Sequence, residues 1–68
     1  PAPGPLTRRE LEVAALVARG MSSRQIAARL VLSLRTVDFH VGNIRAKLGF
    51  ATRAQIAGWW VSTQGPID

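Results

Sequence analysis

The segment from Gly20 to Gly49 constrains the fold of this 68-residue chain more than any other part. Its pattern is typical of a short helix, a tight turn and a longer helix. Glycine tolerates the left-handed backbone that commonly ends a helix, so the two glycines bound the unit. Two helices joined by a tight turn form a helix-turn-helix, whose second helix can enter the major groove of DNA. The segment therefore predicts a surface for DNA on its second helix.

Signals for the start of a helix recur along the chain. A Ser or Thr followed three positions later by Glu or Gln forms a capping box, in which side chains and backbone amides pair reciprocally. Such boxes occur at Thr7–Glu10, Ser22–Gln25 and Thr52–Gln55, and Ser33 is a further N-cap. We expect the four helices that follow these caps to end near Arg19, Leu30, Leu48 and Ser62.

Apolar residues recur at helical spacing within these segments, which predicts one shared core. No alternating run is long enough to predict a strand. We therefore predict an all-α fold, a compact four-helix domain containing the helix-turn-helix. It spans residues 6–62, after a linker remnant at residues 1–5 and before a flexible tail at residues 63–68. The expected core residues are Leu6, Val13, Leu16, Val17, Ile26, Ala27, Leu30, Val37, Val41, Ile44, Leu48, Ile56 and Trp60.

Charge narrows the class of partner. The chain has nine Lys and Arg against four Asp and Glu, a net charge of +5, and all but one of the cations are arginine. Arginine makes bidentate contacts with phosphates and bases, so the surplus favours a nucleic acid, although it can also serve solubility alone. The chain has no cysteine and no apolar run of the ~18 residues that span a bilayer. We expect no membrane contact, no metal, no cofactor and a cytoplasmic location.

The helix after Ser33 is expected to present a mixed face opposite its buried stripe. Arg35 can donate hydrogen bonds to guanine, and Phe39 can touch a thymine methyl. Gly42 lets the helix approach DNA closely, although it costs about 1 kcal/mol relative to alanine. Alternatively, Gly42 is merely tolerated and Phe39 packs on a neighbour. The predicted base-contacting residues are Arg35, Asp38, Phe39, Gly42 and Asn43.

Phosphate contacts are predicted around the same helix. The unpaired N–H groups at a helix start attract an anion, and Thr36 adds a hydroxyl donor there. The Ser33 hydroxyl can act in the same way, or it can be used by the cap. Cations near the unit would position the protein without reading sequence, or would be ordinary surface charges. The predicted phosphate-contacting residues are Ser33, Thr36, Arg24, Arg45, Lys47 and Arg53.

Several short motifs occur in a fixed order along residues 6–60. They are Leu6-Thr7-x-Arg9-Glu10, Gly20-Met21-Ser22, Ile26-Ala27-x-x-Leu30, Ser33-x-x-Thr36-Val37-x-x-His40, Ile44-x-x-Lys47-Leu48-Gly49 and Thr52-Arg53-Ala54. In this combination the chain resembles the LuxR-type helix-turn-helix domain, the C-terminal DNA-binding module of the LuxR and NarL/FixJ regulators.

The resemblance implies a four-helix domain whose third helix reads the major groove and whose fourth helix forms a dimer contact. It implies base contacts at Arg35, Asp38, Phe39 and Gly42, and phosphate contacts near Thr36. Asp38 and Gly42 depart from the lysines of some relatives, and Asp38 could either accept from a cytosine amino group or repel phosphate. Val31 stands where relatives often have glycine, so a left-handed conformation there would be strained.

Catalysis is poorly supported by the sequence. The single histidine, His40, is two positions from Asp38 on a helix, so the two side chains do not face each other. His40 is expected beside the core, bonded to backbone or to a phosphate, and Glu10 as a cap and buried anchor. Trp59 is expected to be exposed on the last helix, where it would anchor a dimer or pack against the loop after the third helix.

We therefore predict the C-terminal DNA-binding domain of a bacterial transcription regulator. It would bind double-stranded DNA at an inverted repeat as a homodimer through its fourth helix. Two alternatives remain at this point. One is a module like sigma-factor region 4 that docks on RNA polymerase, and the other is a helical protein-interaction module that binds no nucleic acid.

Overall fold

The chain forms four α-helices in a computed structural model that describes residues 5–64. They are α1 (Arg8–Ala18), α2 (Ser23–Leu30), α3 (Leu34–Leu48) and α4 (Arg53–Gln64). Within the described range there is no strand, so the predicted all-α fold is confirmed. α4 continues past Ser62, its predicted end, to Gln64, because nothing in Thr63 or Gln64 interrupts the helix. Pro5 of the predicted linker is described. Residues 1–4 of the linker and residues 65–68 of the predicted tail lie outside the described residues.

Each helix begins at the predicted cap. The Thr7 and Glu10 side chains each accept the other residue's backbone amide, at 3.1 and 3.0 Å. The Ser22–Gln25 box has the same geometry before α2, and Thr52 and Gln55 form a looser version before α4. These bonds satisfy amides that a helix start leaves without intrahelical partners, which is why the boundaries follow from the local sequence.

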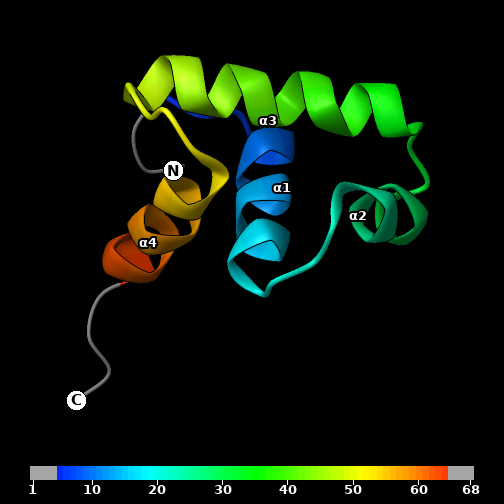
Figure 1. Cartoon of the computed structure of the whole chain (residues 1–68), viewed down its shortest axis with the longest axis horizontal. Coiled ribbons are helices and arrows are strands. Elements are labelled where there is room, and N and C mark those ends of the chain that lie inside the picture. Colours follow the sequence, from blue (N-terminus) through cyan, green and yellow to red (C-terminus); the bar gives the residue numbers. More distant parts are fainter. Residues whose placement is uncertain (1–4, 65–68) are drawn as a thin grey trace.

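α1 is the central element of the fold. It packs against each of the other three helices, with α2 and α4 on either side of it and α3 running across (Figure 1). The largest fully buried side chains come from all four helices: Val13, Ile26, Val37, Ile44 and Ile56. Leu30, Leu48 and Trp60, which were predicted as core, are half-buried at its margin. The core thus fixes α3 by one stripe and leaves the rest of its surface free.

The turn between α2 and α3 contains a strained residue. Val31 ends α2 in the left-handed conformation, with φ 57° and ψ 50°, and its side chain is 88% exposed. Its amide donates to the Ala27 carbonyl, as does the amide of Leu32, so the turn closes the helix as glycine usually would. A β-branched residue rarely adopts this conformation, which costs about 1–2 kcal/mol.

Candidate nucleic-acid interface

The face of α3 opposite the core carries the residues predicted to contact bases. Arg35, Asp38 and Phe39 are exposed, and Gly42 and Asn43 are half-buried. Phe39 keeps 63% of its surface open, and its ring lies 6.0 Å from the His40 ring, tilted by 58°. Phe39 is therefore not buried among neighbouring residues and could contact a ligand.

Gly42 is not required by packing within the chain. A Cβ added there would meet no heavy atom within 4 Å. Its backbone is helical, so no left-handed conformation demands glycine either. Because glycine costs about 1 kcal/mol relative to alanine inside a helix, its presence gives the fold no benefit. What Gly42 does provide is a gap in the exposed surface of α3 between Asp38 and Ala46.

Two hydroxyl groups lie at the start of α3, those of Ser33 and Thr36, and only the Thr36 hydroxyl has a hydrogen atom that is not already donated. Ser33 Oγ accepts the Thr36 amide at 3.0 Å and donates to Thr36 Oγ1 at 2.8 Å. The Ser33 hydroxyl is thus used by the cap, one of the two roles foreseen for it. The Thr36 hydroxyl accepts that bond and keeps its own proton for an outside acceptor. Of the two, Thr36 is the one whose donor remains available.

Three of the predicted phosphate-contacting cations also have partners within the protein. Lys47 Nζ lies 2.7 Å from Glu10 Oε1. Arg45 donates to the Ala51 carbonyl at 3.2 Å, on the loop between α3 and α4. Arg53 donates to two groups near the start of α2, as described below. Arg24, in contrast, is exposed on α2 and has no hydrogen-bond or ion-pair partner among the described residues.

Glu10 is the buried anchor that the sequence predicts. It is 4% exposed, and Oε1 accepts both the Thr7 amide and the Lys47 ammonium. Burial by itself raises the pKa of this carboxyl. The hydrogen bonds from Lys47 and Thr7, together with the ammonium charge, outweigh burial and leave the pKa below its ordinary value of 4.5. The pair joins the first turn of α1 to the last turn of α3.

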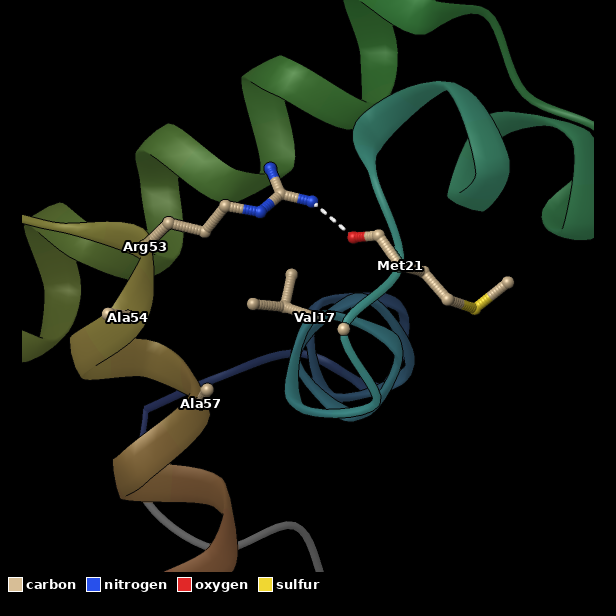
Figure 2. Close-up of a pocket in the computed structure, with 6 residues that line it drawn as sticks. Val17, Met21, Arg53, Ala54 and Ala57 are labelled. Atoms are coloured by element: carbon tan, nitrogen blue, oxygen red, sulfur yellow. Dashed lines mark hydrogen bonds between the residues drawn. The ribbon is translucent and has the colours of Figure 1, made fainter.

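Arg53 joins α4 to the start of α2. Its guanidinium donates to the Ser23 hydroxyl at 2.8 Å and to the Met21 carbonyl at 2.9 Å. Figure 2 shows the side chain reaching across from α4 to Met21, above Val17. Beneath it lies a shallow hollow of about 270 Å³, lined by Val17, Gly20, Met21, Arg53, Ala54 and Ala57. The sequence does not reveal this link, because the Ser23 hydroxyl and the Met21 carbonyl are both distant from Arg53 along the chain.

His40 follows Phe39 on α3. The ring is half-buried, and its Nδ1 is buried with no hydrogen-bond partner among the described residues. His40 is thus partly buried, as expected from the sequence, but its Nδ1 has no bond to backbone among the described residues, and a bond to phosphate stays a prediction.

Trp59 is less exposed than predicted. It is half-buried and packs against the core, with its ring 6.3 Å from that of Trp60. The most exposed large apolar residue on α4 is Val61, at 64%, which the sequence analysis did not single out. A periodic pattern could not find it, because apolar residues occur around the whole circumference of α4.

Within residues 5–64 there is no group of three or more His, Cys, Asp or Glu that could hold a metal ion. No helix in this range is long and apolar enough to cross a membrane.

Comparison with known proteins agrees with this geometry. The model of a family described as bacterial regulatory proteins, luxR family, matches residues 4–60. The chain is 50% identical over 52 residues to the uncharacterized transcriptional regulatory protein YhcZ of Bacillus subtilis, covering 76% of this chain and 24% of that protein. It is 43% identical over 60 residues to the transcriptional regulatory protein UhpA of Escherichia coli, covering 81% and 31%.

The similarity covers only a part of each relative. A third relative, an HTH-type transcriptional regulator of Mycobacterium bovis, is 47% identical over 53 residues, which are 78% of this chain and 6% of that protein. The chain thus spans between 6% and 31% of the length of these relatives.

Proposed function

This chain belongs to the luxR family of bacterial regulatory proteins, which are DNA-binding transcription regulators rather than enzymes, and we propose that it reads double-stranded DNA with α3 in the major groove. The observation that carries the proposal is the free face of α3. Arg35, Asp38 and Phe39 are exposed together on a rigid helix whose other side is fixed in the core. A donor, an acceptor and an apolar ring are the groups that distinguish base edges in the major groove.

Phosphate contacts would orient α3 in the groove. The start of α3 offers unpaired amides and the free proton of Thr36, and exposed Arg24 lies on the preceding helix. Arg45, Lys47 and Arg53 have partners within the protein, so we propose that they contact phosphate only with the N–H groups that remain. Such contacts supply affinity without sequence preference.

We further propose that the domain acts as a dimer on an inverted repeat. α4 has no charged residue after Arg53, and its outer surface includes Gly58 and Val61. An uncharged helix surface with an exposed apolar residue suits a self-complementary contact. Trp59 would support it from the margin of the core. Half-sites would then lie about one helical turn of DNA apart.

We propose a cellular location from this role. A regulator that binds bacterial promoters works in the cytoplasm, where it meets RNA polymerase. The alternative of a helical protein-interaction module predicts no binding to duplex DNA at all.

The deciding experiment is selection of bound duplexes from a random pool, followed by affinity measurements at two salt concentrations. We expect an enriched sequence with two-fold symmetry, and affinity that falls steeply with salt because phosphate contacts release counterions. Arg35→Ala should weaken binding to the selected duplex by about 1–3 kcal/mol while changing random duplex much less. Absence of an enriched sequence, or affinity indifferent to salt, would overturn the proposal.

A further inference from the structure

Asp38 is an anion on the surface that is expected to meet a polyanion. Two ion pairs occur among residues 5–64, Arg9–Glu12 and Lys47–Glu10. Asp38 is the one acidic residue of that range that belongs to neither. It is exposed on α3, on the same side as Arg35 and Phe39.

The neighbours of Asp38 on α3 leave its carboxylate available. Residues one turn away on a helix are its natural partners. In the preceding turn these are Leu34, which is apolar and 44% exposed, and Arg35, whose guanidinium is not within ion-pair distance. In the following turn they are Val41, which is buried, and Gly42, which has no side chain and open space around it. No group on α3 therefore occupies the acceptor positions of the carboxylate.

The stability of α3 does not explain the presence of an aspartate at position 38 either. An acidic residue favours a helix when it lies in the first turn, where it interacts with the positive end of the helix dipole. Asp38 lies beyond the first turn of α3, which contains no acidic residue. Aspartate is also a weak helix former in a helix interior. The residue thus gives the fold little, and close to DNA it repels phosphate.

We propose that Asp38 reads a cytosine in the major groove, an inference that rests on the proposed function of α3. A carboxylate only accepts hydrogen bonds. In the major groove guanine and thymine present acceptors to it, whereas cytosine N4 and adenine N6 present amino donors. The adenine amino group stands beside the acceptor N7, which repels the second carboxylate oxygen. Cytosine N4 is flanked on its own base by C5–H instead of an acceptor, and the acceptor of the paired base (guanine O6 or thymine O4) lies beside the amino group in both cases, so cytosine fits the carboxylate best.

The negative charge of Asp38 also discriminates between duplex sequences. On duplexes without a cytosine at its position, the carboxylate is unpaired and close to phosphates, so binding is weakened there. Arg35, one turn earlier, supplies the complementary donor for guanine. Together they favour a half-site that contains both bases, and Asp38 does so mainly by penalising the wrong sequences.

The test is to repeat the random-pool selection with the wild type and with two variants of the 68-residue chain. In Asp38→Asn the side chain keeps its shape and gains donors, so it matches adenine N6 and N7. We expect wild type to select cytosine at one position of the half-site, and Asp38→Asn to select adenine there. Asp38→Ala should lose the preference at that position alone, and its affinity for random duplex should rise.

A base analogue isolates the atom involved. Replacing the selected cytosine by 2-pyrimidinone, which lacks the 4-amino group, should weaken wild-type binding by about 5- to 150-fold, and should change binding by Asp38→Ala little. The main result of this experiment is obtained with wild type, so it remains valid even if a substitution disturbs folding. Circular dichroism of both variants checks that the helices remain.

The outcomes separate this proposal from the one it rests on. If wild type enriches no sequence, the proposed function fails. If wild type enriches a sequence and all three proteins share every base preference, the function stands and the role of Asp38 is overturned. Selection of guanine, thymine or adenine by wild type at the position that residue 38 controls also overturns it, as does full affinity for the 2-pyrimidinone duplex.

Discussion

The Lys47 ammonium lies 2.7 Å from the Glu10 carboxylate, and this contact ties the last turn of α3 to the first turn of α1. The carboxylate is buried, whereas the lysine is partly open to solvent. Because Glu10 Oε1 also accepts the Thr7 amide, one atom serves both the start of α1 and the position of α3. The orientation of α3 thus depends on Glu10, a residue that lies outside the candidate interface.

Removing the charge of Glu10 should destabilise the domain. Glu10→Gln keeps an oxygen for the Thr7 amide but leaves Lys47 without its counter-ion. A hydrogen bond to a charged group contributes about 1.5–3 kcal/mol, so the free energy of unfolding in urea should fall by that amount. The control is Glu12→Gln, which breaks the exposed pair with Arg9 and should cost about 0–1 kcal/mol. Equal losses in the two variants would contradict the role given to Glu10.

The same pair should make stability depend on pH. The pKa of Glu10 is lower in the folded protein than its ordinary value of 4.5, so between the two values the unfolded chain binds more protons. The contribution of the pair is therefore complete above about pH 4.5 and is lost as the pH falls through the folded-state value. Urea unfolding from pH 7 to pH 3 should show wild type and Glu10→Gln converging in acid. A constant difference across that range would be inconsistent with this linkage.

Local signals in the sequence predicted most of the fold. The capping boxes at Thr7, Ser22 and Thr52 act within a few residues, so they define helix starts without knowledge of the tertiary structure. The exposed face of α3 also follows from the sequence, because the apolar stripe from Val37 to Leu48 has a single helical period. These features depend on the residue and its near neighbours alone.

Contacts between distant segments could not be predicted in the same way. Lys47 and Glu10 are 37 positions apart, and the charge of Lys47 gave no indication that it faces a buried partner. Arg53 binds the Met21 carbonyl, a group that every residue has. The burial of Trp59 depends on how α4 is rotated against α1, and the apolar residues all round α4 do not determine that rotation.

Relieving the strain at Val31 should stabilise the domain. Val31→Gly removes about 1–2 kcal/mol of left-handed strain, and the greater freedom of the unfolded glycine offsets about 0.4–1 kcal/mol of it. Little burial is lost, since the side chain is exposed. We expect the free energy of unfolding to rise by roughly 0.5–1 kcal/mol in urea or thermal melts. Val31→Ala, which retains the Cβ and therefore the strain, should show a smaller gain, and a loss of stability in Val31→Gly would refute the assignment.

Filling the gap at Gly42 should separate stability from DNA binding. Gly42→Ala should raise the free energy of unfolding by up to about 1 kcal/mol, since alanine is the better helix former and the site has open space. If α3 approaches the base edges closely at this point, the added methyl should weaken binding to a single half-site duplex. The control is Gly58→Ala on α4, which also has open space and should stabilise similarly without changing half-site affinity. Unchanged affinity in Gly42→Ala would mean that the glycine is merely tolerated.

A charge at Val61 should test the proposed dimer while leaving the fold intact. Val61 is exposed, so Val61→Glu disturbs no core packing, but in a two-fold contact through α4 it would bring two carboxylates together. Cooperative binding of two copies to an inverted repeat should weaken roughly tenfold or more, whereas half-site affinity should not change by that factor.

Ser62→Glu adds the same charge to the adjacent exposed position, turned away from Val61, and should affect cooperativity much less. Trp59→Ala is a poorer probe, because Trp59 packs against the core and its loss should also lower the free energy of unfolding, by up to about 3 kcal/mol. Cooperativity that survives Val61→Glu, as measured by sedimentation and by titration of one- and two-site duplexes, would place the dimer contact elsewhere than on this surface of α4.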